Sequence, residues 1–242
     1  MRAVRVVAHR GSSSAHPDNT WPAFEGAVAE GADAIECDVQ ATRDGVLVIR
    51  HDFTLGNRLV VDLSAAELEA AQPSVIRLAD LFDWAKHTNV ELLVEVKEPD
   101  AALAVSAMVS ASAARDRIVV GGFHGPALAA VKASQRAIRT SFMIGSVIAA
   151  EEILHVAAVY RVDGVHLCWE GRAPRPHDLL EAALIERLRR ADLTTTLWHE
   201  EREDELRALV ALEPDAICTN TPGVLRRIVD KHHARRVAII EP

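Results

Sequence analysis

The sequence predicts an α/β fold, a (β/α)8 barrel that forms a single domain over residues 1–242. Short apolar runs of strand length alternate with helical patterns along the chain, which is typical of a parallel sheet with helical crossovers. Eight such runs are each followed by a helical segment, and eight strands close a barrel. No glycine-rich fingerprint follows the first run, which disfavours an open dinucleotide-binding sheet.

The eight predicted strands cover residues 4–8, 35–39, 90–97, 118–121, 138–144, 164–167, 194–198 and 216–218. The first helix is predicted to begin after a cap at Asn19 or Thr20 and to stop at Gly31. The other helices are predicted at residues 78–87, 101–114, 126–134, 149–160, 177–190 and 203–212, and a last one starts near Pro222.

A β-hairpin is predicted directly after the second strand. Asp44-Gly45, between runs rich in Val and Leu, is typical of a tight hairpin turn. The turn would fold His51 back toward the second strand, where alternation places Glu36 and Asp38 on one face. The pattern is compatible with a charged surface hairpin or with the start of a metal site.

The insertion after the hairpin covers residues 53–73 and is too short for a separate domain. Ser64 and Glu67 have the spacing of a capping box, which predicts one short helix within it. The chain is long enough for one large hydrophobic core, so a single domain is expected.

The overall charge excludes some partners. The net charge is -8 and the Lys and Arg residues are scattered, which argues against nucleic-acid binding. No run approaches the roughly 18 apolar residues of a membrane span, and the first apolar run is too short for a signal peptide. We therefore expect a cytoplasmic protein without stable membrane insertion.

Several reactive residue types have plain structural explanations. The cysteines are odd in number, lack metal-ligand spacing and are expected to pack as small hydrophobes: Cys37, Cys168 and Cys218. Three histidines are expected on helices or loops without partners for a site: His155, His166 and His177.

Polar residues gather at the predicted carboxyl ends of several strands. In a barrel these ends meet at one face, where side chains from different strands converge. The residues placed at or near them are His9, Arg10, Glu36, Asp38, Glu95, Lys97, His124, Trp198 and Asn220. This face is therefore the predicted functional site.

Glu36, Asp38 and Glu95 are predicted to lie on adjacent strands. Two carboxylates about 4 Å apart repel by about 4 kcal/mol at an effective dielectric of about 20, which equals about three pKa units. Three carboxylates cannot all stay ionised unassisted, so either protons are retained or a cation binds. An all-oxygen cluster suits Mg²⁺ or Ca²⁺ better than Zn²⁺.

Hydrogen-bond donors surround this anionic cluster. The planar fork of Arg10 matches phosphate oxygens, and Lys97 and a metal ion would help to neutralise charge during phosphoryl transfer. His9 and His51 can divide the work of proton removal or attack and of leaving-group protonation. The set predicts phosphodiester cleavage.

An ordered series of motifs resembles the glycerophosphodiester phosphodiesterase family. The motifs are His9-Arg10-Gly11, Pro17-Asp18-Asn19-Thr20, Glu36-Cys37-Asp38, Thr42-Arg43-Asp44-Gly45, His51-Asp52 and Glu95-Val96-Lys97. A weaker similarity continues through Gly122-Phe123, Trp198 and Thr219-Asn220-Thr221-Pro222.

The resemblance implies a TIM barrel, a place in lipid metabolism and a role for each matching residue. It implies a divalent cation on Glu36, Asp38 and Glu95, the acid-base pair His9 and His51, Arg10 and Lys97 on phosphate, and Trp198 beside the alcohol. His124 is a further candidate for substrate contact or a solvated loop residue. The expected reaction converts a small glycerophosphodiester into an alcohol and a phosphomonoester. If this chain accepts the usual substrate of the family, the phosphomonoester is glycerol 3-phosphate.

The chain also departs from the family pattern. The family usually has Glu at Asp18, Asp at Asn220, and a Thr and an Asn near Trp198 where this chain has His199 and Glu201. In the family, the insertion after the His-Asp pair is usually longer than the segment 53–73 of this chain. Two alternatives stay open: a phosphate-ligand binding protein with little turnover, and a lyase that forms a cyclic phosphate.

Overall fold

Eight parallel strands form a closed barrel, as the sequence predicts. The computed structural model describes residues 3–169, 171–180 and 182–240. In order around the barrel, the strands are β1 (Arg5–His9), β2 (Ala34–Ala41), β7 (Glu91–Val96), β8 (Ile118–Gly122), β9 (Arg139–Ile144), β10 (Gly164–Cys168), β11 (Thr194–Trp198) and β12 (Ala216–Thr219). The barrel closes because β1 pairs in parallel with both β2 and β12.

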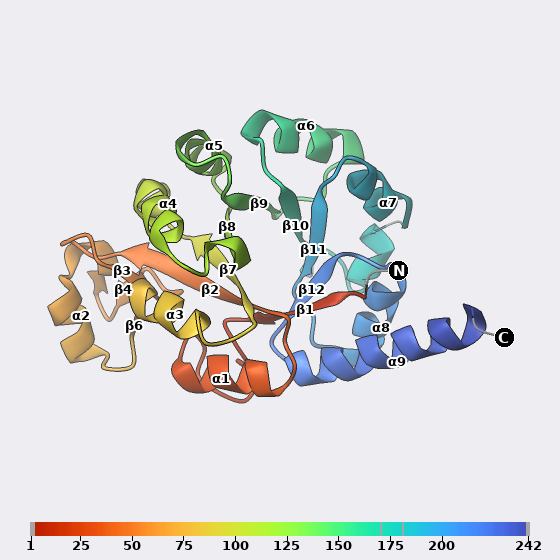
Figure 1. Cartoon of the computed structure of the whole chain (residues 1–242), viewed down its shortest axis with the longest axis horizontal. Helices are drawn as coiled ribbons and strands as arrows, with labels where there is room; N and C mark the ends of the chain where they lie inside the picture. Colours follow the sequence, from red (N-terminus) through yellow and green to blue (C-terminus); the bar gives the residue numbers. More distant parts are fainter. Residues whose placement is uncertain (1–2, 170, 181, 241–242) are drawn as a thin grey trace.

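Helices follow the barrel strands in sequence and lie outside them (Figure 1). They are α1 (Trp21–Ala29), α2 (Ala65–Ala71), α3 (Leu78–Ala85), α4 (Ala102–Ala111), α5 (Gly125–Ser134), α6 (Ala150–Tyr160), α7 (Ala182–Arg190), α8 (Glu203–Ala211) and α9 (Pro222–Ile240). Short 3-10 turns lie at Val60–Asp62, Pro99–Ala101, Arg115–Arg117 and Pro176–Leu179. Among the described residues, no helix combines the length and apolarity required to cross a membrane.

One predicted helix differs from the structure. The segment 177–190 begins in a 3-10 turn, and only its later part is helical, as α7. Glu205 on α8 explains the turn, because its Oε1 accepts a hydrogen bond from the backbone N–H of His177 and lies 2.7 Å from His177 Nδ1. His177 therefore contacts Glu205, an interaction that the sequence did not predict.

The predicted hairpin is present and extends the sheet beside β2. Its strands and those of the insertion are β3 (Leu47–Ile49), β4 (Thr54–Leu55), β5 (Arg58–Leu59) and β6 (Ile76–Arg77). β3 pairs antiparallel with β2, and across the turn Thr42 N donates to Val46 O at 2.9 Å. The predicted capping box is confirmed, since Ser64 and Glu67 bond reciprocally at the start of α2.

Alternation along β2 separates the core from the site. Ile35, Cys37 and Val39 point outward into the buried layer beneath the helices, where they join residues such as Phe24 and Leu81 in one hydrophobic core. Glu36 and Asp38 point into the barrel. All three cysteines are buried and free, as predicted.

The barrel interior is lined by small and polar side chains near its amino-terminal end. A cavity of about 130 Å³ lies there, and Ser141, His166 and Thr196 contribute to its wall. His166 lies on β10, opposite Thr196 of β11, with only 4% of its surface exposed. The expectation that His166 lies on a helix or loop is therefore wrong.

His166 predicts a measurable loss of stability in acid. Burial lowers its pKa from 6.5 to about 3, so between these values the unfolded chain binds a proton that the folded chain does not. The free energy of unfolding therefore falls as the pH drops through this window. We expect His166→Gln to lose less stability than wild type between pH 7.5 and pH 5.5 in urea unfolding.

A matched control is His155→Gln, because His155 is exposed on α6. This variant should retain the pH dependence of the wild type. An equal slope for His166→Gln and wild type would contradict the assignment of this acid sensitivity to His166.

Candidate active site

The turn after β1 brings the first two site residues into place. Arg10 and Gly11 both have positive φ angles, +58° and +86°. A Cβ on Gly11 would lie 2.6 Å from the carbonyl carbon and oxygen of Ala23 on α1, so only glycine fits this close approach. The turn leaves His9 buried and directs Arg10 toward the acidic residues of β2.

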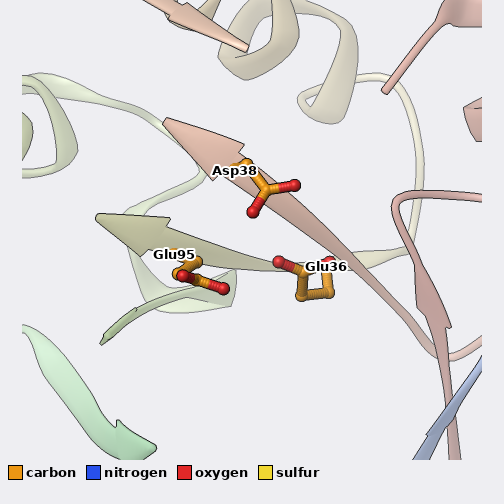
Figure 2. A group of neighbouring side chains, drawn as sticks. All are labelled: Glu36, Asp38 and Glu95. Atoms are coloured by element: carbon orange, nitrogen blue, oxygen red, sulfur yellow. The ribbon is translucent and has the colours of Figure 1, made fainter. Parts of the chain in front are cut away.

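Glu36, Asp38 and Glu95 form one cluster inside the carboxyl end of the barrel. Glu36 and Asp38 are two residues apart on β2, and the parallel register places Asp38 beside Glu95 on β7. Figure 2 shows the three side chains projecting toward one another from these two strands. One oxygen from each lies within 4.8 Å of the others, and each residue is no more than 2% exposed. The sequence prediction of this cluster is confirmed.

Burial and mutual repulsion determine the electrostatics of the cluster. The pKa of Glu36 is raised well above its ordinary value by burial, then by Asp38 and Glu95. Burial and Asp38 also raise the pKa of Glu95, while Lys97 and His51 act in the opposite direction. The cluster therefore favours bound protons or bound cations over three bare carboxylates.

Two basic side chains offset part of this charge. Lys97 Nζ lies 3.2 Å from Asp38 Oδ1 and 3.0 Å from Glu95 Oε1. Arg10 Nε lies 3.1 Å from Asp38 Oδ2, and its NH1 lies 3.0 Å from Asp18 Oδ2. Arg10 and Lys97 thus contact the cluster itself, as the sequence predicts for their position.

The donor set fits a hard divalent cation. Within the described part of the chain, Glu36 Oε1 and Glu95 Oε2 are buried oxygens without a hydrogen bond, while Asp38 Oδ1 has Lys97 Nζ 3.2 Å away. Buried polar atoms normally have partners, and oxygen ligands with no thiolate are the preference of hard cations. The cluster could therefore hold such an ion.

Asn19 supports the cluster instead of capping the first helix. Its Nδ2 donates to Asp38 Oδ2 at 2.8 Å, and its Oδ1 accepts from Asp38 N at 3.4 Å. Thr20 is the residue at the N-cap of α1, and its side chain makes no capping bond. Asn19 has φ +56°, a conformation that asparagine tolerates better than most residues.

His9 is held at one nitrogen and by two neighbouring rings. Its Nδ1 lies 2.8 Å from Asn220 Oδ1, which also accepts a hydrogen bond from Ser13 Oγ at 2.7 Å. Its ring stacks on His199 at 4.6 Å between centroids and meets the edge of Trp198 at 5.3 Å. Burial, then Arg10 and His199, lower the pKa of His9 to about 3. The ring is therefore neutral, with Nε2 3.9 Å from Glu36 Oε2.

The loop carrying His51 is held by Gln40 of β2. The buried side-chain amide of Gln40 donates to the backbone oxygens of Arg50, His51 and Asp52 at 2.8, 3.1 and 2.9 Å. His51 Nδ1 lies 2.9 Å from Asp52 Oδ1, and 37% of the His51 side chain is exposed. The hairpin therefore returns His51 to the site face, as predicted, at its solvent edge.

Trp198 and His124 have different surroundings. Trp198 ends β11 and contacts His9 and Phe123, with ring centroids 5.3 and 5.9 Å away. His124 is exposed, and its Nδ1 accepts a hydrogen bond from Ala127 N at the start of α5. This helix cap accounts for His124 without a substrate, and a substrate contact for it stays a prediction.

An open cavity of about 570 Å³ adjoins His9. Its wall includes Arg10, Asp18, His199, Glu201 and Asn220. Sequence reasoning assigned no role in the site to Gln40 or Asn19, and it named His199 and Glu201 only as departures from the family pattern. For Gln40 a signal existed, because it continues the Glu36 and Asp38 alternation by two residues. The others lie in loops whose conformation no periodicity predicts.

The close approach at Gly11 can be tested by adding one methyl group. Gly11→Ala should lower the free energy of unfolding by about 2–4 kcal/mol, because left-handed strain adds to a steric clash. Gly45→Ala is the matched control, since Gly45 has φ +77° and open space around it, and should cost about 1–2 kcal/mol. Equal losses for the two variants in urea unfolding would contradict the clash.

Comparisons with known proteins identify relatives of this chain. Among relatives, Probable glycerophosphodiester phosphodiesterase 1 of Mycobacterium tuberculosis is 38% identical over 119 residues, which span 39% of this chain and 43% of that protein. The glycerophosphodiester phosphodiesterase of Caldanaerobacter subterraneus subsp. tengcongensis is 25% identical over 249 residues, or 93% and 98% of the two chains.

Solved structures share the fold. A phosphodiesterase from Oleispira antarctica, in complex with the product sn-glycerol-3-phosphate, has a TM-score of 0.81 and 20% identity, with 94% of this chain and 97% of that chain covered. The glycerophosphodiester phosphodiesterase of Thermotoga maritima has a TM-score of 0.80 and 20% identity, with 94% and 99% covered. The model of the Glycerophosphoryl diester phosphodiesterase family matches residues 9–224, and the chain therefore belongs to that family.

Proposed function

We propose that this protein hydrolyses glycerophosphodiesters to an alcohol and glycerol 3-phosphate at a divalent-cation site. The observation that carries the proposal is the buried cluster of Glu36, Asp38 and Glu95, with Arg10, Lys97 and His9 against it. Family membership supports the reaction class, and the Oleispira antarctica structure supports the product, because that protein binds sn-glycerol-3-phosphate.

Glu36, Asp38 and Glu95 would hold Mg²⁺ or Ca²⁺ through carboxylate oxygens. When bound, the cation would neutralise charge on the phosphate oxygens. Arg10 and Lys97 add fixed positive charge beside the same position, and their partly buried surroundings strengthen that interaction relative to water. These two residues would orient the phosphate and stabilise the charge that develops on it.

His9 is suited to act as base or nucleophile. Asn220 Oδ1 can only accept, so His9 carries its proton on Nδ1 and keeps the lone pair on Nε2. That nitrogen faces the acidic cluster, where the phosphate would lie. As a base, Nε2 would take the proton of the attacking oxygen while the new P–O bond forms.

His51 is suited to act as the acid. It lies at the exposed edge of the site beside Asp52, where a departing alcohol can reach solvent. His51 would donate a proton to the alcohol oxygen as its bond to phosphorus breaks. Trp198, whose ring contacts His9, stays a predicted contact for the substrate.

Removal of either histidine should abolish most turnover. We expect His9→Ala and His51→Ala to lower kcat at least about 100-fold, the usual contribution of acid-base catalysis. The assay is a panel of glycerophosphodiesters and aryl phosphodiesters with Mg²⁺, Ca²⁺ or chelator. His155→Ala is the surface control and should match wild type.

The cation prediction has a readout independent of turnover. Mg²⁺ or Ca²⁺ should raise the Tm of wild type, and this rise should be lost in Glu36→Gln and Glu95→Gln, because a ligand that binds only the folded state stabilises it. Phosphorus NMR of the product separates a monoester from a cyclic phosphate. Tight phosphate binding without product at any metal would contradict the proposed hydrolysis.

A further inference from the structure

Four side chains beside the acidic cluster form a closed circuit of contacts. His9 Nδ1 bonds Asn220 Oδ1 at 2.8 Å, and the backbone N–H of Asn220 donates to Glu201 Oε1 at 3.2 Å. Glu201 Oε1 also lies 2.9 Å from His199 Nδ1, and the His199 ring stacks on His9 with 20° between the ring planes. Each member is thus fixed by two others.

The circuit restrains the orientation of the His9 ring, which the hydrogen bond to Asn220 alone does not fix. Asn220 fixes only one nitrogen, so small rotations about the Cα–Cβ and Cβ–Cγ bonds of His9 could still tilt its ring. A ring stacked at 4.6 Å on one face and an indole edge at 5.3 Å restrict those rotations. Glu201 in turn orients both His199 and the backbone of Asn220.

We propose that His199 and Glu201 are positioning residues that fix the ring plane and the Nδ1–H tautomer of His9. The inference rests on the proposed function, in which Nε2 of His9 is the reactive atom. Catalytic groups must be held close to their productive geometry, and a misplacement of about 1 Å can cost about 100-fold in rate. His199 and Glu201 act through His9 and need not touch the reacting atoms.

A purely structural role fits these two residues poorly. Their side chains are 28% and 37% exposed and line the open cavity. The neighbouring Glu200 anchors the loop instead. It is buried, and its Oε1 accepts hydrogen bonds from the backbone N–H groups of Glu201 and Arg202 and from Arg202 Nε.

This difference provides matched variants. Glu201→Ala and His199→Ala should lower kcat about 10- to 100-fold with KM changed less than about 3-fold, since orientation and not substrate affinity is lost. Their Tm should match wild type, whereas Glu200→Ala should lower Tm because it removes the loop anchor. Glu201→Gln keeps an oxygen acceptor for His199 and Asn220 and should recover kcat to within about 3-fold of wild type.

The tautomer of His9 gives a readout that does not need turnover. Two-bond proton–nitrogen NMR correlations should assign the proton of His9 to Nδ1 in wild type and to a mixture of both nitrogens in Glu201→Ala. His155→Ala should leave the His9 signals unchanged.

The outcomes separate the two proposals. An active wild type whose Glu201→Ala and His199→Ala variants keep its kcat, or lose kcat and affinity in parallel, overturns the positioning role. A wild type that is inactive on every phosphodiester, with the His9 tautomer still lost in Glu201→Ala, overturns the proposed function and leaves the positioning contact in place.

Discussion

Repulsion among three buried carboxylates is the constraint on which the site depends. Burial and their mutual proximity raise the pKa values of Glu36 and Glu95, so the fold must bring positive charge to them. Arg10 and Lys97 provide part of it from the ends of two strands. Asn19 adds a neutral donor to Asp38. The turn after β1, the start of α1 and the end of β7 are all arranged around this need.

The apolar core and the charged cluster occupy different parts of the barrel. Outside the strands, apolar side chains of β2 and its neighbours pack under the helices and need no polar partner. Inside, the amino-terminal end holds the cavity beside His166, whose wall includes Glu91 and its ion-pair partners Arg5 and Arg139. The carboxyl end holds the buried acidic cluster. Because strand alternation assigns each residue to one side, the acidic pair of β2 can face inward without interrupting the core.

The fold and the acidic cluster were predictable from the sequence. Strand alternation places Glu36 and Asp38 on one face, and the pairing of neighbouring parallel strands places Glu95 beside Asp38. Loop contacts follow no such period. Either Asn19 or Thr20 was expected to cap α1, and Thr20 occupies that position. The hydrogen bond of Asn19 to Asp38 was not predicted, because it depends on the left-handed backbone of Asn19. His124 at a strand end serves a helix cap. The segment 177–190 begins in a 3-10 turn instead of an α-helix. The backbone N–H of His177 donates there to Glu205, a residue that lies far along the chain.

The two histidines differ in burial, and the difference suits the separate chemical tasks that we propose for them. A base or nucleophile must keep its lone pair aimed at phosphorus, and the contacts of His9 with Asn220, Trp198 and His199 would provide that restraint. An acid must regain its proton from solvent after each turnover, which a fully buried ring would do slowly. His51 meets this need on an exposed loop, where Gln40 restrains the backbone and leaves the ring accessible. Rigidity at one histidine and access at the other thus follow from their different settings, because His9 ends a buried strand and His51 lies on an exposed loop.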